Sequence, residues 1–156
     1  MLSVPLSEEQ LAPMLGEELD IAAVNAPKMC VVAGRSDRIA DLESSLAAKE
    51  IDSKRLRLAA ASHTRLLEPI LAEFRAGIAA IRLSKPTLPY VSNVTGAWVK
   101  DEDAVNPDYW VKHFRRTVRF SQGVAELLKD PNRVLLEVGP GQTLGSLAKQ
   151  QPVKPA

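Results

Sequence analysis

The 156-residue sequence contains a single cysteine, so it cannot form an internal disulfide bond. Cys30 lies in an apolar run, where a small hydrophobic side chain is expected in the core rather than as a nucleophile. No apolar run approaches the roughly 18 residues that a membrane-spanning helix needs. The N-terminal segment also lacks the basic region and the long apolar core of a secretory signal. These absences favour a cytoplasmic protein.

An excess of charge of one sign is also missing. The sequence has 20 Lys and Arg residues against 19 Asp and Glu residues, which gives a net charge of +1. Nucleic-acid-binding proteins normally carry a clustered basic excess, so this class is disfavoured. Two short basic stretches, residues 54–57 and 112–116, are typical of solvated faces. The content of 46% hydrophobic and 25% charged residues is that of a globular domain.

The first 60 residues predict strands and helices in the order βαββαβ. Ser7 and Gln10 have the spacing of a capping box, and the helix that they begin should stop at Gly16. Ser36 is expected to cap a second helix, whose apolar residues recur at spacings of three and four. The expected strands cover residues 1–5, 19–24, 29–33 and 54–60. This order is the split βαβ, or ferredoxin-like, pattern.

The second part of the chain predicts mostly helices. A long apolar stripe predicts one helix over residues 64–81, in which Pro69 is tolerable only near the first turn. Asn106 and Pro107 form a strong helix start. The other expected elements are a short strand over 88–92, a bend at Gly96 and a helix from Ser121.

Residues 133–138 predict a strand of a different kind. Their apolar run is nearly continuous, which is typical of a strand buried on both faces. The sequence offers only one or two plausible neighbours for such a strand. We therefore expect the chain to be part of something larger, with residues 150–156 as the start of a linker.

His63 is the main candidate for chemistry because it lies between a predicted strand end and a predicted helix start. A helix N-terminus disfavours imidazolium, so the neutral ring could act as a base; a capping or loop histidine is the alternative. Neither His63 nor His113 has other ligands at metal-binding spacing, so no metal site is expected. Ser62 invites a nucleophile interpretation, but the sequence has no G-x-S-x-G elbow.

A glycine-rich junction at residues 138–145 could cradle a phosphate at a helix N-terminus, or it could be a tight structural turn. Its G-x-G-x-x-x-G spacing does not support a dinucleotide-binding fold.

The order of several motifs along the chain is more specific than any one of them. The motifs are IAAVNAP (21–27), VVAG (31–34), ASHT (61–64), EPIL (68–71), VSNVTG (91–96), YW (109–110), VRF (118–120) and EVGPG (137–141). In this order they resemble the malonyl-CoA:acyl carrier protein acyltransferase domain of modular polyketide synthases. The resemblance covers nearly the whole chain.

The resemblance implies an α+β fold in two parts. Residues 1–61 would form a complete ferredoxin-like small subdomain, and residues 62–156 the C-terminal part of an α/β-hydrolase-like large subdomain. The implied reaction is a ping-pong transfer, in which a serine takes a malonyl or methylmalonyl extender group from coenzyme A. The serine then passes that group to the phosphopantetheine thiol of an acyl carrier protein. No bound cofactor is implied; the partners would be the carrier protein, the rest of the domain and neighbouring synthase domains.

The resemblance also assigns roles to individual residues. His63 matches the catalytic histidine, and His113 falls where a backbone carbonyl orients that ring. Asn25 matches an asparagine that faces the substrate cleft, and Ser62 occurs where methylmalonyl-selective members often have serine. Ala60 matches neither common pattern of extender selectivity.

Other functional parts of the family are not in the sequence. The G-H-S-x-G nucleophile, the oxyanion loop and the arginine that binds the extender carboxylate are absent from the 156 residues. We therefore expect the chain alone to be inactive and to associate with itself or a partner. A non-catalytic module that docks a carrier protein is the alternative.

Overall fold

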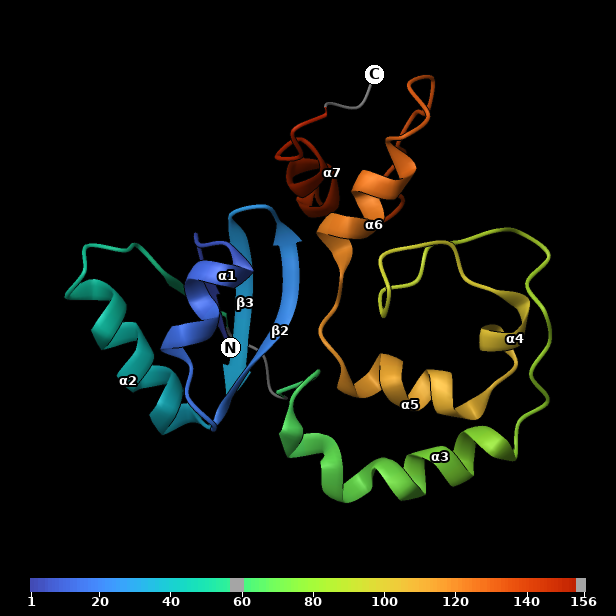
Figure 1. Ribbon diagram of the computed structural model, residues 1–156, viewed down its shortest axis with the longest axis horizontal. Coiled ribbons are helices and arrows are strands. Elements are labelled where there is room, and N and C mark those ends of the chain that lie inside the picture. The colour runs from blue at the N-terminus through green and yellow to red at the C-terminus, as the bar shows by residue number, and fades with distance from the viewer. Residues whose placement is uncertain (57–60, 154–156) are drawn as a thin grey trace.

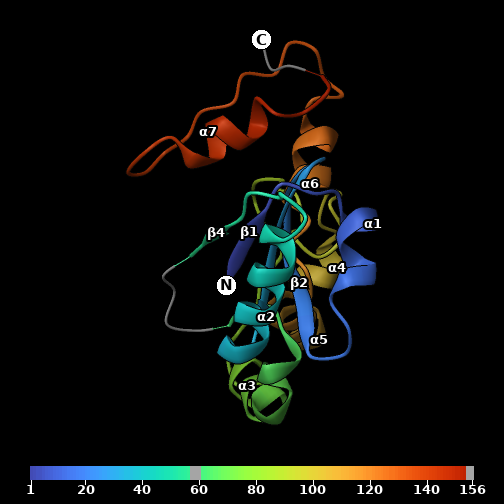
Figure 2. The ribbon, with the colours of Figure 1, turned by 90° about the vertical axis from the view of Figure 1, so that its left-hand side faces the viewer.

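The computed structural model describes residues 1–56 and 61–153. A four-stranded sheet with two helices forms one part of the molecule, and helices α3 to α5 form a second part beside it (Figure 1). Helices α6 and α7 lie at one end of both parts, and α7 projects beyond the sheet with its flanking loops (Figure 2). None of the helices in these residues is long and apolar enough to cross a bilayer.

The sheet has the strand order β2-β3-β1-β4, and all neighbouring strands are antiparallel. Its strands are β1 (Leu2–Val4), β2 (Leu19–Ala26), β3 (Met29–Gly34) and β4 (Lys54–Arg55). Helix α1 (Glu8–Leu11) connects β1 to β2, and α2 (Ser36–Ala47) connects β3 to β4. The predicted order of strands and helices is therefore confirmed. Residues 57–60, the remainder of the predicted fourth strand, and Ala60 with them, lie outside the described residues.

Both helices cover the same face of the sheet. The main hydrophobic core contains side chains from β1, β2, β3, α1 and α2, including the completely buried Leu2, Leu11 and Leu46. The spacing of Ile39, Leu42 and Leu46 places them together in this core, as their periodicity predicts. A smaller cluster around Val31 lies on the opposite face.

The two helices of this part begin differently from each other. Ser7 and Gln10 form the predicted capping box, and the chain continues as a 3-10 helix (Ala12–Met14) to a turn at Gly16. The prediction that Ser36 caps α2 is wrong. Arg35 is the extended residue before that helix, and Ser36 is already helical.

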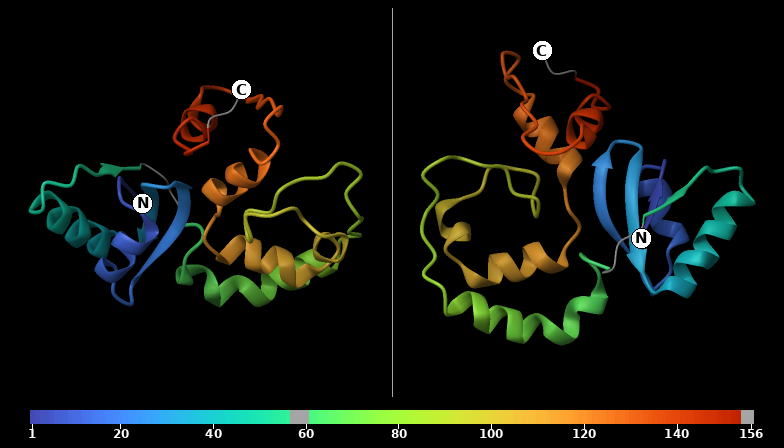
Figure 3. Two further views of the ribbon diagram at one scale, coloured as in Figure 1. Left: turned by 45° about the horizontal axis from the view of Figure 1, so that its top comes forward. Right: turned by 180° about the vertical axis from the view of Figure 1, so that it is seen from behind.

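The predicted single helix over residues 64–81 is divided in two. Residues Arg65–Ile70 form a 3-10 helix, and α3 (Leu71–Ala79) follows it. Pro69 has no N–H to donate within a regular α-helix, which explains why the α-helical ladder begins only after it. Helices α3 and α5 (Pro107–Arg115) run side by side (Figure 3), and Phe74 stacks on Phe114 with ring centroids 4.5 Å apart.

The predicted strand over 88–92 is reduced to a single bridge residue, Val91, and a tight turn follows it at residues 93–95. One antiparallel bridge joins Val91 to Trp98, and the Gly96 amide donates to the Ser92 carbonyl at 2.8 Å. After α4 (Asp101–Ala104), Asn106 caps α5 with its side chain, as predicted.

Residues 133–138 do not form the predicted buried strand. Among the described residues no strand pairs with this segment, and its alternate side chains Val134, Leu136 and Val138 are 77%, 84% and 89% exposed. A strand buried on both faces needs neighbours to supply its backbone hydrogen bonds. Only Leu135 packs inward, against the cluster between α6 (Phe120–Leu127) and α7 (Thr143–Ala148).

Candidate active site

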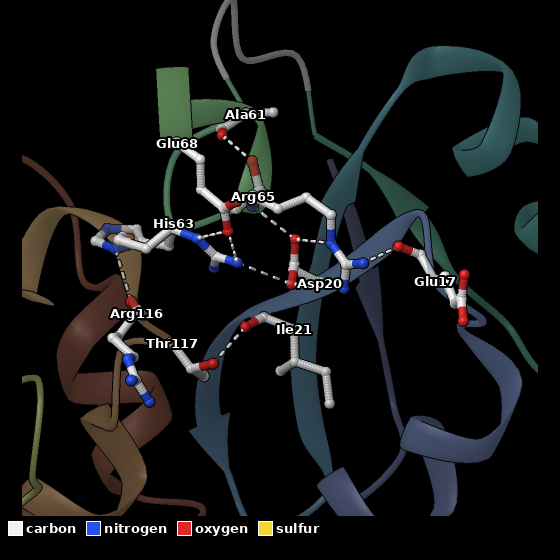
Figure 4. Close-up of polar contacts among 11 residues, drawn as sticks. Glu17, Asp20, Ile21, Ala61, His63, Arg65, Glu68, Arg116 and Thr117 are labelled. Atoms are coloured by element: carbon white, nitrogen blue, oxygen red, sulfur yellow. Dashed lines mark hydrogen bonds and ion pairs between the residues drawn. The ribbon is translucent and has the colours of Figure 1, made fainter. Parts of the chain in front are cut away.

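His63 lies in a turn that leads into the 3-10 helix, next to the end of α5 (Figure 4). Its Nδ1 atom is 3.0 Å from the carbonyl oxygen of Arg116. Its backbone is in the left-handed region, with a φ of 60°. A non-glycine residue in that region is strained, and such strain concentrates at functional sites. The following Thr64 is completely buried, and its hydroxyl donates to the Ala61 carbonyl at 2.8 Å, which closes the turn.

The contact with a carbonyl oxygen defines which ring nitrogen carries the proton. A carbonyl only accepts hydrogen bonds, so Nδ1 must be the donor. In the neutral ring, Nε2 then has a free lone pair and can accept a proton. This arrangement leaves Nε2 able to accept a proton while a backbone carbonyl holds Nδ1–H.

The carbonyl at this position belongs to Arg116 and not, as expected, to His113. Arg116 directly follows Arg115, the last residue of α5, and its backbone is extended with a φ of −84° and a ψ of 158°. Its carbonyl has therefore left the helical ladder and is free to accept from another donor.

His113 contributes its ring to the site instead. The His63 and His113 rings meet edge to face, with centroids 6.4 Å apart. Burial lowers the pKa of His113, and the neighbouring His63 lowers it further. A neutral His113 adds no positive charge beside His63.

An ionic network surrounds the residues that follow His63. The Arg65 amide donates to the Asp20 carboxylate at 2.8 Å, and the Arg65 guanidinium donates to the same carboxylate at 3.1 and 3.2 Å. The guanidinium also donates to the Glu17 carbonyl. Arg115 lies 3.8 Å from Asp20 and donates to Glu68 at 3.0 Å. Burial alone would raise the pKa of Asp20, but the hydrogen bonds from Arg65 and the charge of Arg115 lower it overall.

Residues 117–119, here called the edge segment, run along the free edge of β2. The Thr117 hydroxyl donates to the Ile21 carbonyl at 2.7 Å, and Val118 exchanges two backbone hydrogen bonds of 2.9 Å with β2. A parallel bridge joins Val118 to Ala23. The edge segment thereby fixes the chain that follows Arg116 to the sheet.

The other predicted site residues are less closely connected. Ser62 is half-buried in the same turn as His63, and Asn25 is half-buried on β2. In the part of the chain that the structure describes, neither the Ser62 nor the Asn25 side chain is hydrogen-bonded to the His63 ring. No group of three or more potential metal ligands occurs among residues 1–56 and 61–153.

The glycine-rich junction has a structural role. The Glu137 carboxylate accepts from the amides of Leu144 and Gly145 at 3.1 and 2.9 Å. These amides lie at the start of α7, so a carboxylate of the chain itself already occupies the position considered for a phosphate.

A family model described as the acyl transferase domain matches residues 1–154. The chain belongs to the acyl transferase domain family. Among curated relatives, a phenolphthiocerol/phthiocerol polyketide synthase polypeptide of Mycobacterium tuberculosis is 35% identical over 97% of this chain. Polyketide synthase GfsB of Streptomyces halstedii is 36% identical over 92% of the chain. The chain spans only 10% and 3% of the lengths of these two relatives.

Solved acyltransferase domains have the same fold. The acyl transferase domain of SpnD, in complex with 2-(pent-4-yn-1-yl)malonyl, is 42% identical to the chain with a TM-score of 0.91. The match covers 96% of this chain and 36% of that domain. Malonyl CoA-acyl carrier protein transacylase of Burkholderia pseudomallei is 23% identical with a TM-score of 0.82, so the fold extends to that enzyme.

Proposed function

We propose that the chain supplies the base-bearing part of an acyltransferase domain that loads extender acyl groups from coenzyme A onto an acyl carrier protein. The observation that carries the proposal is the 3.0 Å contact between His63 Nδ1 and the Arg116 carbonyl. It leaves Nε2 available as a base, in a chain that belongs to the acyl transferase domain family.

The proposed reaction uses the imidazole twice. His63 Nε2 takes the proton from a serine hydroxyl elsewhere in the complete domain, because a serine is a weak nucleophile until a base removes that proton. The serine oxygen attacks the acyl thioester, and the departing thiolate of coenzyme A takes the proton from Nε2. In the second half, Nε2 deprotonates the carrier protein's phosphopantetheine thiol, which attacks the acyl-serine. The serine oxygen then recovers the proton.

The Arg116 carbonyl stabilises the imidazolium that forms in each half. It accepts from Nδ1–H throughout, and the hydrogen bond strengthens when the ring becomes charged. A neutral carbonyl raises the basicity of the ring less than a carboxylate would. The ring can therefore release the proton again to a leaving group.

The strand order supports the proposed division of the fold. The order β2-β3-β1-β4, with α1 and α2 on one face, supports assigning residues 1–61 to a ferredoxin-like unit. Residues 62–156 would belong to the large subdomain. The exposed side chains at Val134, Leu136 and Val138 are those that a neighbouring strand and helix would cover there.

The test of this function follows covalent acylation in the complete domain that contains these residues. After mixing with malonyl-CoA, intact mass spectrometry should detect acyl-enzyme in the unchanged domain. His63→Ala should slow its formation by roughly 10²- to 10⁴-fold, the usual contribution of a general base. His113→Phe, which keeps a ring beside His63, serves as the control and should have a much smaller effect.

Two results would overturn the proposal. One is full acylation by the folded His63→Ala domain. The other is rapid acylation of the 156-residue chain itself, which contains no G-H-S-x-G serine and should remain unlabelled.

The proposed extender is a substituted malonyl group. Ser62 lies where methylmalonyl-selective members of the family often have serine. The related SpnD domain was solved in complex with a substituted malonyl group. Competition between malonyl-CoA and methylmalonyl-CoA should favour the latter. A clear preference for malonyl-CoA would refute this assignment.

A further inference from the structure

Two consecutive residues of β2 hold both sides of the contact between His63 and Arg116. Asp20 accepts from the backbone amide of Arg65, two residues after His63. The Ile21 carbonyl accepts from the hydroxyl of Thr117, one residue after Arg116. Figure 4 shows both contacts between the His63–Arg116 pair and strand β2. The ring and its acceptor are thus each tied to the same short piece of strand.

The hydrogen bonds at Asp20 are suited to fixing a backbone rather than only a side chain. The carboxylate accepts one backbone and two guanidinium hydrogen bonds from Arg65, so that residue is fixed at both ends. The Asp20 side chain is only 16% exposed, which distinguishes it from the exposed ion pairs elsewhere on the surface. The turn at His63 needs such support because its left-handed backbone is not favoured locally.

Thr117 acts on the other side of the contact. Its 2.7 Å hydrogen bond to Ile21 is followed by the two backbone hydrogen bonds of Val118 to β2. The carbonyl of Arg116 comes directly before these anchored residues, so a displacement of Thr117 would move it. Within the described part of the chain, no hydrogen bond of the α5 ladder restrains that carbonyl, because the helix has already ended.

We propose that Asp20 and Thr117 are positioning residues that set the His63 ring against the Arg116 carbonyl and thereby fix its Nδ1–H tautomer. The catalytic consequence rests on the proposed function, whereas the effect on the tautomer does not. A ring displaced by about 1 Å can lose roughly 100-fold in rate, so the two contacts would act on turnover without touching substrate.

The experiment combines kinetics with ¹⁵N-histidine NMR on the complete acyltransferase domain. Asp20→Asn removes the charge, and Asp41→Asn is the matched control on α2, where an exposed carboxylate pairs with Arg38. Thr117→Val removes the hydroxyl, and Thr117→Ser restores it. A His63→Gln domain identifies the His63 resonances.

Asp20→Asn should lower kcat by roughly 10- to 100-fold, with a smaller change in KM. Thr117→Val should lower kcat by roughly 3- to 10-fold, the size expected for one hydrogen bond, and Thr117→Ser should recover it. Both damaging variants should shift the ¹⁵N signals of His63 away from the Nδ1–H tautomer. Asp41→Asn should leave kcat and the tautomer unchanged.

A variant with reduced thermal stability but an unchanged tautomer and unchanged kcat would overturn the proposal, because the contact would then be only structural. An unchanged tautomer with a reduced kcat would also overturn it. If the unchanged domain transfers no acyl group while the variants still lose the Nδ1–H tautomer, the positioning role stands and the proposed function fails.

Discussion

Replacing Gly96 with alanine should be among the most damaging single-methyl changes in the chain. Gly96 has a φ of +68°, and an added Cβ would lie 2.4 Å from the Cβ of Gln122 on α6. The left-handed backbone costs an alanine about 1–2 kcal/mol. Forcing the methyl group against Gln122 costs about 1–3 kcal/mol more. The sum predicts that Gly96→Ala lowers the free energy of unfolding by about 2–5 kcal/mol.

Two other glycines separate these contributions. Gly16 has a φ of +59°, but none of the described residues places an atom within 4 Å of an added Cβ, so Gly16→Ala should show only the backbone cost of about 1–2 kcal/mol. Gly77 lies inside α3 with open space and no positive φ, so Gly77→Ala should stabilise the protein by up to about 1 kcal/mol.

Urea denaturation of the complete domain, monitored by circular dichroism, measures all three variants. The expected order of stability is Gly77→Ala, unchanged protein, Gly16→Ala and then Gly96→Ala. If Gly96→Ala is no less stable than Gly16→Ala, the close approach to Gln122 contributes nothing and the reasoning is refuted.

Three further predictions concern pH, the core and a helix end. Because burial and the nearby His63 lower the folded-state pKa of His113 below 6.5, the unfolded chain binds this proton at higher pH than the folded chain does. The contribution of His113 to the free energy of unfolding should therefore be fully present above pH 6.5 and decline below it. His113→Phe should flatten this decline in urea titrations between about pH 7 and about pH 5, and an equally steep decline in the variant would contradict this. Leu46→Ala should lower the free energy of unfolding by about 2–5 kcal/mol in urea denaturation, because the Leu46 side chain is completely buried. The control is Leu88→Ala at a side chain that is 78% exposed, which should change that free energy by less than about 0.5 kcal/mol. Glu137→Gln should speed hydrogen exchange of the amides at the start of α7, since it weakens two hydrogen bonds there, and unchanged exchange would show that the carboxylate charge is unimportant.

The fold of residues 1–56 could be predicted well because its sequence signals are local. Alternating apolar residues, the capping box at Ser7 and the stripe on α2 all act over a few residues, and each occurs where expected. The errors in the second part have a common cause. The segment 133–138 has the composition of a buried strand, but burial depends on neighbours that composition does not supply. The apolar stripe likewise predicts one helix over residues 64–81, whereas the segment that contains Pro69, Arg65–Ile70, forms a 3-10 helix.

The site could be predicted only in part. His63 stands out because it is a titratable residue at a junction between elements. The Arg116 carbonyl has no side-chain signature, and its position depends on the residue at which α5 ends. Asp20 and Arg65 are 45 residues apart, and nothing in either local sequence indicates that they meet. Sequence patterns report local propensity, whereas this site is assembled by contacts between distant segments.

The left-handed backbone of His63 separates what folding favours at this position from what catalysis would require. Glycine tolerates a φ of 60° without strain, asparagine tolerates it better than most residues, and a β-branched valine tolerates it poorly. A library at position 63 selected only for folded protein should therefore enrich glycine and asparagine. The same library selected for acyl transfer should retain histidine. Selection for thermostability without a turnover assay would thus favour the replacement of His63, the proposed base. Position 63 is therefore one to keep constant when the protein is stabilised by consensus substitutions.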